Sequence, residues 1–193
     1  MKKRTMGTTN QMFRGFVFAT CLTFIFTFSL PHVAMAKTAK QIDAEVDEAL
    51  SLFSKQVEGA KGFLNSAKGV LVLPNIVKAG LGVGGQYGEG ALRIGGRTVA
   101  YYSVAAGSVG LLIGVQKTNL VLVFRQDVAL KKFRAGTGWK ARVDGSVAFI
   151  DAGMGKSLDT MNFRDPVVAF LFGQKGLMAS AAIEGGKFTK LVR

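Results

Sequence analysis

The 193-residue chain contains one cysteine and one histidine, and both Cys21 and His32 lie within its first 36 residues. Without that segment, residues 37–193 contain neither side chain. Structural disulfides, thiolate nucleophiles, serine–histidine pairs and His/Cys zinc sites are then excluded, because each needs one of these side chains. We therefore expect no catalytic residues, no metal and no cofactor, and a fold held by its hydrophobic core alone.

Residues 1–36 have the organisation of a cleaved secretory signal peptide. Their first part is basic, with Lys2, Lys3, Arg4 and Arg14. The apolar stretch Phe16–Leu30 follows, and Ala34-Met35-Ala36 is an A-x-A cleavage pattern. This stretch is shorter than the roughly 20 residues that span a bilayer, which favours cleavage over the alternative of an uncleaved anchor. We predict an exported protein that begins at Lys37, in the periplasm or at the inner face of the outer membrane.

Acidic residues are scarce: 12 stand against 25 lysines and arginines, which gives a formal net charge of +13. Residues 1–36 hold four of the basic residues and no acid, so residues 37–193 carry +9. Residues 37–58 are slightly acidic, and the charge is concentrated in residues 59–193. A body this basic indicates an anionic partner. Because we expect export, we predict membrane lipid headgroups and not nucleic acid.

Hydrophobic periodicity changes from helical to strand-like along the chain. A capping box, Thr38-x-x-Gln41, precedes apolar residues at helical spacing from Ile42 to Val57, which predicts a long helix. A shorter helix is predicted through Phe63–Lys68. Strands are predicted over residues 70–73, 77–87, 90–94, 98–104, 107–115, 119–125, 138–143, 146–151, 167–172 and 177–184.

Turn and cap signals divide these strands. The buried run 70–73 is expected to stop at Pro74, and Gly95-Gly96 and Lys117–Asn119 are expected to be hairpin connections. A further helix is predicted over Val128–Arg134, with Asp127 as its N-cap.

Glycine, in contrast, is abundant, with 25 residues. Six of them fall between residues 80 and 90, at positions 80, 82, 84, 85, 88 and 90. Such spacing leaves one face of a strand bare, which allows a neighbouring element to pack closely or the strand to coil sharply. The sequence thus predicts an α+β fold over residues 37–193, a single domain. Its N-terminal helix packs on a strongly coiled, Gly-rich antiparallel β-sheet or partly closed barrel.

Two other motifs favour structural roles over chemistry. Gly80-x-Gly82-x-x-Gly85 matches the dinucleotide-binding pattern, but Gln86–Gly90 cannot open the helix that this pattern requires. The carboxylates Asp144, Asp151, Asp159 and Asp165 fall close together. Two of them stand in turn dipeptides and their spacing is not that of an EF-hand, so we expect turn roles.

Residues 67–90 also resemble the opening signature of the SYLF-domain family. The matching pieces are Ala67–Gly69, Val70–Pro74, Lys78–Gly80 and Gly84–Gly90. Later family strands resemble Gly110–Gln116, Leu120–Phe124, Gly145–Gly155 and Gly176–Gly185, with Tyr102-Ser103 where members usually have Trp-Ser. The resemblance implies a non-enzymatic module that binds acidic lipid headgroups. In eukaryotic relatives these are phosphoinositides, and fungal relatives also bind actin.

The residues best suited to lipid binding lie in the segment 125–142. They are Arg125, Lys131, Lys132, Arg134, Trp139, Lys140 and Arg142. Lysine and arginine are attracted to anionic membranes, and tryptophan prefers the headgroup layer. We expect these residues to make peripheral contact with acidic phospholipids or other anionic envelope lipids. The alternative is a solvated basic helix with Trp139 in the core, in which case Lys68 and Lys78 are the next candidates.

A different class of function also fits the composition. The protein would then be a structural or protein-interaction module of the cell envelope, and its charge would only hold it near the surface.

Overall fold

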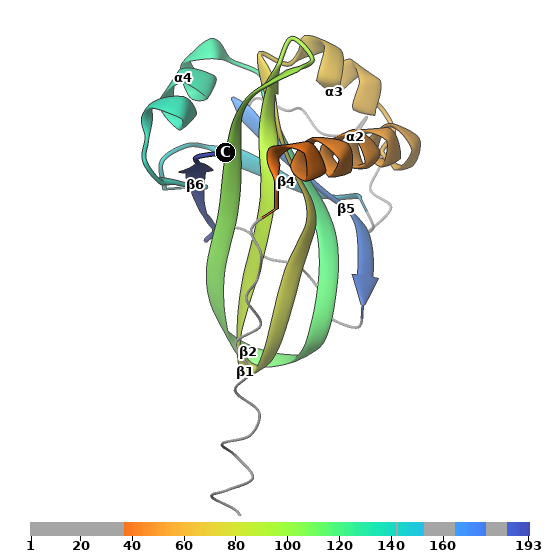
Figure 1. The fold of residues 1–193 in the computed structure, drawn as a ribbon, viewed down its shortest axis with the longest axis vertical. Coiled ribbons are helices and arrows are strands. Elements are labelled where there is room, and N and C mark those ends of the chain that lie inside the picture. Colours follow the sequence, from red (N-terminus) through yellow and green to blue (C-terminus); the bar gives the residue numbers. More distant parts are fainter. Residues whose placement is uncertain (1–36, 142, 153–164, 177–184) are drawn as a thin grey trace, which may run out of the picture. The chain divides into compact units, whose positions relative to one another are not determined.

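Three helices and a six-stranded sheet make up the part of the chain that the computed structural model describes, residues 37–141, 143–152, 165–176 and 185–193 (Figure 1). The helices are α2 (Ala39–Gln56), α3 (Ala60–Ser66) and α4 (Asp127–Ala135). The strands are β1 (Gly69–Ile94), β2 (Arg97–Phe124), β3 (Trp139–Lys140), β4 (Val147–Asp151), β5 (Val167–Gly176) and β6 (Lys187–Leu191). The predicted α+β class, with an N-terminal helix on a strongly curled sheet, is confirmed.

One long β-hairpin forms most of the sheet. Strands β1 and β2 pair antiparallel over their whole length, from Gly69 opposite Phe124 to Ile94 opposite Arg97. The turn at Gly95-Gly96 is confirmed, and both glycines have positive φ angles, 56° and 78°. These angles are the ones that a tight two-residue hairpin requires.

The structure corrects several predicted breaks in this hairpin. The strands predicted over residues 70–94 merge into β1, and those over residues 98–125 merge into β2. Pro74 does not end a strand, because a bulge between Leu73 and Ile76 absorbs it. Lys117–Asn119 is not a turn but continues β2. Each local turn signal predicted a break, and none of them showed that a single strand continues through these positions.

The hairpin folds back on itself, so that the two ends of β1 cross at close range (Figure 1). A Cβ atom built on Gly90 would lie 1.8 Å from the carbonyl oxygen of Val72. One built on Gly88 would lie 2.6 Å from a side-chain carbon of Ile76. Only glycine fits at these positions. The predicted close packing is therefore confirmed there, although the element packed closely is the start of the same strand.

The remaining strands extend the sheet from β2. Strand β5 pairs antiparallel with one end of β2 and β6 with the other. Strand β4 runs parallel to β5, so the sheet is mixed, which corrects the expectation of a purely antiparallel sheet. Strand β6 was not predicted, and the strand predicted over 177–184 lies outside the described residues.

Helix α2 covers one apolar core with Ile42, Val46 and Phe53 of its predicted stripe and with Ala49, which was not predicted, whereas the predicted Leu50 is only partly buried. Its capping box is present: the backbone N–H of Gln41 donates to Thr38 Oγ1, and the backbone N–H of Thr38 donates to Gln41 Oε1. The ring of Phe53 packs against Phe170 and Phe172, at centroid distances of 5.1 and 5.2 Å. The second core lies under α4.

A buried ion pair fastens the end of the chain to β1. The carboxylate of Glu89 is 6% exposed, and its Oε1 accepts hydrogen bonds from the Tyr87 hydroxyl at 2.7 Å and from Arg193 Nη2 at 2.9 Å. Desolvation and the bond to Glu89 raise the pKa of Tyr87 to about 12. The second oxygen, Glu89 Oε2, has no partner among the described residues. The buried charge therefore depends on Arg193.

Replacing Arg193 with alanine is expected to lower the free energy of unfolding by about 3 kcal/mol, because a buried carboxylate loses its cation. The double variant Arg193→Ala, Glu89→Gln should recover part of this loss, since no unpaired charge remains. Urea unfolding of four proteins, the parent, Arg193→Ala, Glu89→Gln and the double variant, measures both effects. A loss in the double variant as large as the sum of the two single losses would contradict the coupling.

Candidate functional site

Helix α4 lies over the second core and directs its other face to solvent (Figure 1). Leu130 and Phe133 are buried, three residues apart on the inner face. Gly69 allows this approach, because a Cβ there would lie 2.9 Å from Leu130 Cδ1. The helix begins at Asp127, with Gln126 as N-cap, one residue before the predicted start.

The basic residues predicted for this segment gather on the exposed side of α4 and on β3. Lys131, Lys132, Arg134 and Lys140 are exposed, and Arg125 is half-buried. Lys132 and Arg134 stand in the last turn of α4, where cations interact favourably with the helix dipole. Arg142 lies outside the described residues. We call the basic side chains of α4, β3 and β6 the basic edge.

Trp139 belongs to the core and not to the basic edge. Its side chain is 4% exposed and packs edge-on against Phe133 and Phe188, at centroid distances of 5.4 and 5.5 Å. This placement corrects the expectation that its indole meets the headgroup layer, because the aromatic cluster is more apolar than that layer. Its emission is therefore not expected to report membrane binding.

Strand β6 adds two lysines that the sequence analysis did not include. Lys187 lies opposite Lys140 in the β3–β6 register, and Lys190 lies opposite Tyr102. Both lysines are exposed. The only local signal was the alternation of the apolar Phe188 with the polar Lys187 and Thr189. That signal is too short to show which edge β6 joins.

A shallow cleft lies beside the basic edge, between α4 and the stretch that contains Trp139 and residues 144–146. Its lining residues are Gln126, Val128, Ala129, Lys132, Trp139, Asp144, Gly145, Ser146, Pro166 and Val167. The carboxylate of Asp144, one of these lining residues, accepts a hydrogen bond from the backbone N–H of Lys140 at 2.6 Å. Val128 lines the cleft and is 75% exposed, and Val143, next to Asp144 in the chain, is 77% exposed. The cleft thus combines the ammonium of Lys132 with the small apolar side chains of Val128 and Ala129.

The other predicted candidates, Lys68 and Lys78, lie outside the three elements that form the basic edge. Lys68 is exposed and follows α3. Lys78 is 6% exposed on β1, opposite Gln116, so its ammonium cannot meet a membrane surface without rearrangement. Within the described ranges, no three His, Cys, Asp or Glu side chains gather as metal ligands would. In the same ranges, no helix combines the length and apolar character needed to cross a bilayer.

Residues 105–191 match the family model described as Ysc84: Las17-binding protein actin regulator. This is the SYLF domain, so the predicted family is confirmed for this part of the chain. The match includes α4, β3 and β6 and therefore the whole basic edge. No curated protein matches the chain.

Proposed function

Because residues 105–191 belong to the Ysc84 (SYLF) family, which is associated with lipid and actin binding, we propose that this protein binds anionic phospholipid headgroups at a membrane surface and catalyses no reaction. The observation that carries the proposal is the basic edge. Its side chains come from three elements and face solvent: Lys131, Lys132, Arg134, Lys140, Lys187 and Lys190.

Electrostatics makes this edge sufficient for reversible binding. Each Lys or Arg near an anionic membrane contributes about 1 kcal/mol, and several act together here. Asp127 stands in the first turn of α4, and Asp144, which lines the adjacent cleft, already accepts a hydrogen bond from the backbone N–H of Lys140. Val128 and Val143 add a small apolar contact, which supports a peripheral and shallow attachment.

The membrane that we propose is that of a bacterial envelope. The proposal rests on the signal-peptide pattern of residues 1–36. In the periplasm or at the inner face of the outer membrane, the anionic lipids would be phosphatidylglycerol, cardiolipin or lipopolysaccharide. Vesicles that contain phosphoinositides, the headgroups that the family resemblance implies for eukaryotic relatives, are tested for comparison with these bacterial lipids.

Vesicle co-sedimentation tests the function. The protein is expected to sediment with vesicles that contain anionic lipid and not with zwitterionic phosphatidylcholine vesicles. Salt at about 0.5 M should release it, because the Debye length falls to about 4 Å. Equal sedimentation with phosphatidylcholine would contradict the electrostatic mechanism. A protein partner retained at that salt concentration, without vesicle binding, would favour the envelope interaction module.

A further inference from the structure

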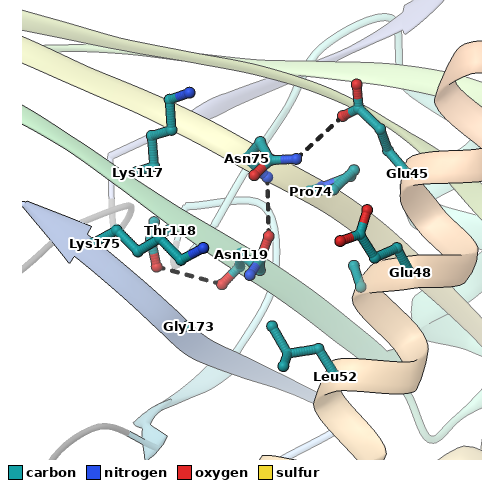
Figure 2. Close-up of a pocket in the computed structure, with 11 residues that line it drawn as sticks. Glu45, Glu48, Leu52, Pro74, Asn75, Lys117, Thr118, Asn119, Gly173 and Lys175 are labelled. Atoms are coloured by element: carbon teal, nitrogen blue, oxygen red, sulfur yellow. Dashed lines mark hydrogen bonds between the residues drawn. The ribbon is translucent and has the colours of Figure 1, made fainter.

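A second polar cleft lies between α2 and the sheet, on residues that the basic edge does not include (Figure 2). Helix α2 contributes Glu45, Glu48, Ala49 and Leu52. The sheet contributes Pro74 and Asn75 from β1, Lys117, Thr118 and Asn119 from β2, and Gly173 and Lys175 from β5. One wall is therefore acidic and the other basic.

The backbone around this cleft is irregular in all three strands. Asn75 has a positive φ of 51° and Gly173 one of 62°. The β1–β2 ladder shifts register just before Ile76, and the β2–β5 ladder shifts between Lys117 and Asn119. Bulges and left-handed residues cost free energy in a sheet and often accompany functional sites.

The side chain of Asn119 contacts both cleft residues that have a positive φ, Asn75 and Gly173. Its side chain is nearly buried, and its Oδ1 accepts a hydrogen bond from the backbone N–H of Asn75 at 2.9 Å. A Cβ atom on Gly173 would lie 2.7 Å from Asn119 Nδ2, so glycine is needed there for space as well as for conformation. The floor of the cleft is thus a fixed polar surface.

The basic wall places two like charges directly opposite each other. Lys117 and Lys175 are partners in the β2–β5 register, and both are exposed. Like charges at opposite positions destabilise a sheet. Neither ammonium forms an ion pair within the described residues. An anion between them would remove this repulsion.

The acidic wall contains one carboxylate that the fold does not use. Other acids of α2 have partners: Asp43 accepts from Thr98 and Tyr101, Asp47 pairs with Arg93, and Glu45, which also lines the cleft, pairs with Lys37. Glu48 has no such partner among the described residues. Figure 2 shows its carboxylate and the ammonium of Lys175 pointing toward each other across the cleft.

We propose that this cleft binds a phosphoethanolamine group, either as the free compound or as a lipid headgroup. Lys117 and Lys175 hold the phosphate, because lysine binds phosphate as a point charge. Glu48, with Glu45 beside it, accepts hydrogen bonds from the primary ammonium, which has three N–H donors. A quaternary ammonium has no N–H to donate and is recognised by aromatic rings, and the lining contains no aromatic residue. The cleft therefore selects ethanolamine over choline.

Calorimetric titration of the purified protein with phosphoethanolamine, phosphocholine and inorganic phosphate tests this site. Saturable binding of phosphoethanolamine is expected, with phosphocholine weaker by about tenfold or more because it makes no hydrogen bond to Glu48. Lys175→Gln and Glu48→Gln should each weaken phosphoethanolamine by about tenfold. Lys61→Gln, on α3, is the control and should change nothing. Equal affinity for phosphocholine, or unchanged affinity in both cleft variants, would overturn the proposal.

Thermal unfolding supplies a second readout that a purely structural lysine would not give. Without ligand, Lys175→Gln should unfold at a slightly higher temperature than the parent, because the repulsion with Lys117 is removed. With phosphoethanolamine, the parent should gain stability and the variant should not. A variant that is less stable without ligand would contradict the role of Lys175 as an unpaired ligand-binding cation.

The source of the group is decided by comparing the free compound with phosphatidylethanolamine placed in phosphatidylcholine vesicles. Binding of the free compound alone identifies a soluble ligand, and binding to the vesicles alone identifies the headgroup. Binding of neither overturns the proposal. A variant with Lys131, Lys132 and Arg134 replaced by alanine should bind phosphoethanolamine as the parent does, so a failure of this site and a failure of the basic edge are separable.

Discussion

A variant in which Gly90 is replaced by alanine is expected not to reach the native fold. The new Cβ would lie 1.8 Å from the carbonyl oxygen of Val72 and 2.7 Å from the Cα of Leu73. Both are main-chain atoms, so no side-chain rotation can relieve the overlap. Val72 and Leu73 are fully buried and paired with β2, so the first half of β1 cannot move away without breaking the ladder and both cores.

The expected result is loss of soluble protein or of the cooperative urea transition, measured by circular dichroism. Gly107→Ala is a matched control in the same hairpin, because nothing lies within 4 Å of its Cβ position and its φ is not positive. That variant should differ from the parent by less than about 1 kcal/mol. A Gly90→Ala protein with the parent's unfolding midpoint would show that the two ends of β1 do not cross as described.

The glycines of residues 80–90 show which features of β1 could be predicted from the sequence and which could not. Their spacing indicated that one face of a strand was bare, and the bend and crossing of β1 confirm this. It could not indicate which glycines are required, because that depends on where the two ends of one strand meet. Gly90 has no space for a Cβ, whereas the nearest atom to a Cβ on Gly85 is 3.7 Å away.

Local signals predicted local structure well. The capping box at Thr38 and the stripe from Ile42 predicted α2, because a helix closes its own hydrogen bonds and buries one face. The site depended on non-local pairing. Lys187 belongs to the basic edge because β6 pairs with β3. Trp139 does not belong to it, because its ring packs with those of Phe133 and Phe188 in the core. No residue spacing within one segment contains that information.

Replacing Lys131, Lys132 and Arg134 together with alanine is expected to weaken binding to anionic vesicles by about two orders of magnitude. Three membrane contacts are lost at about 1 kcal/mol each. Folding should change little, because these side chains are exposed and Leu130 and Phe133 still attach α4 to the core. Alanine also favours the helical conformation.

A matched control separates the position of the charges from their number. Lys40, Lys55 and Lys61 are exposed on α2 and α3, on the side of the domain away from α4 (Figure 1). Replacing these three with alanine removes the same charge. Because long-range attraction between exposed charges is screened beyond about 10 Å at 0.1 M salt, this control should lose only a small part of its affinity.

The most direct measurement is the dissociation constant of the parent, the α4 variant and the α2–α3 control for one preparation of anionic vesicles at constant low salt. We expect the α4 variant to bind about 100-fold more weakly than the parent, with the control within a few-fold of it. If the folded α4 variant binds as tightly as the parent, or if both variants lose the same affinity, the basic edge is not the membrane-binding surface.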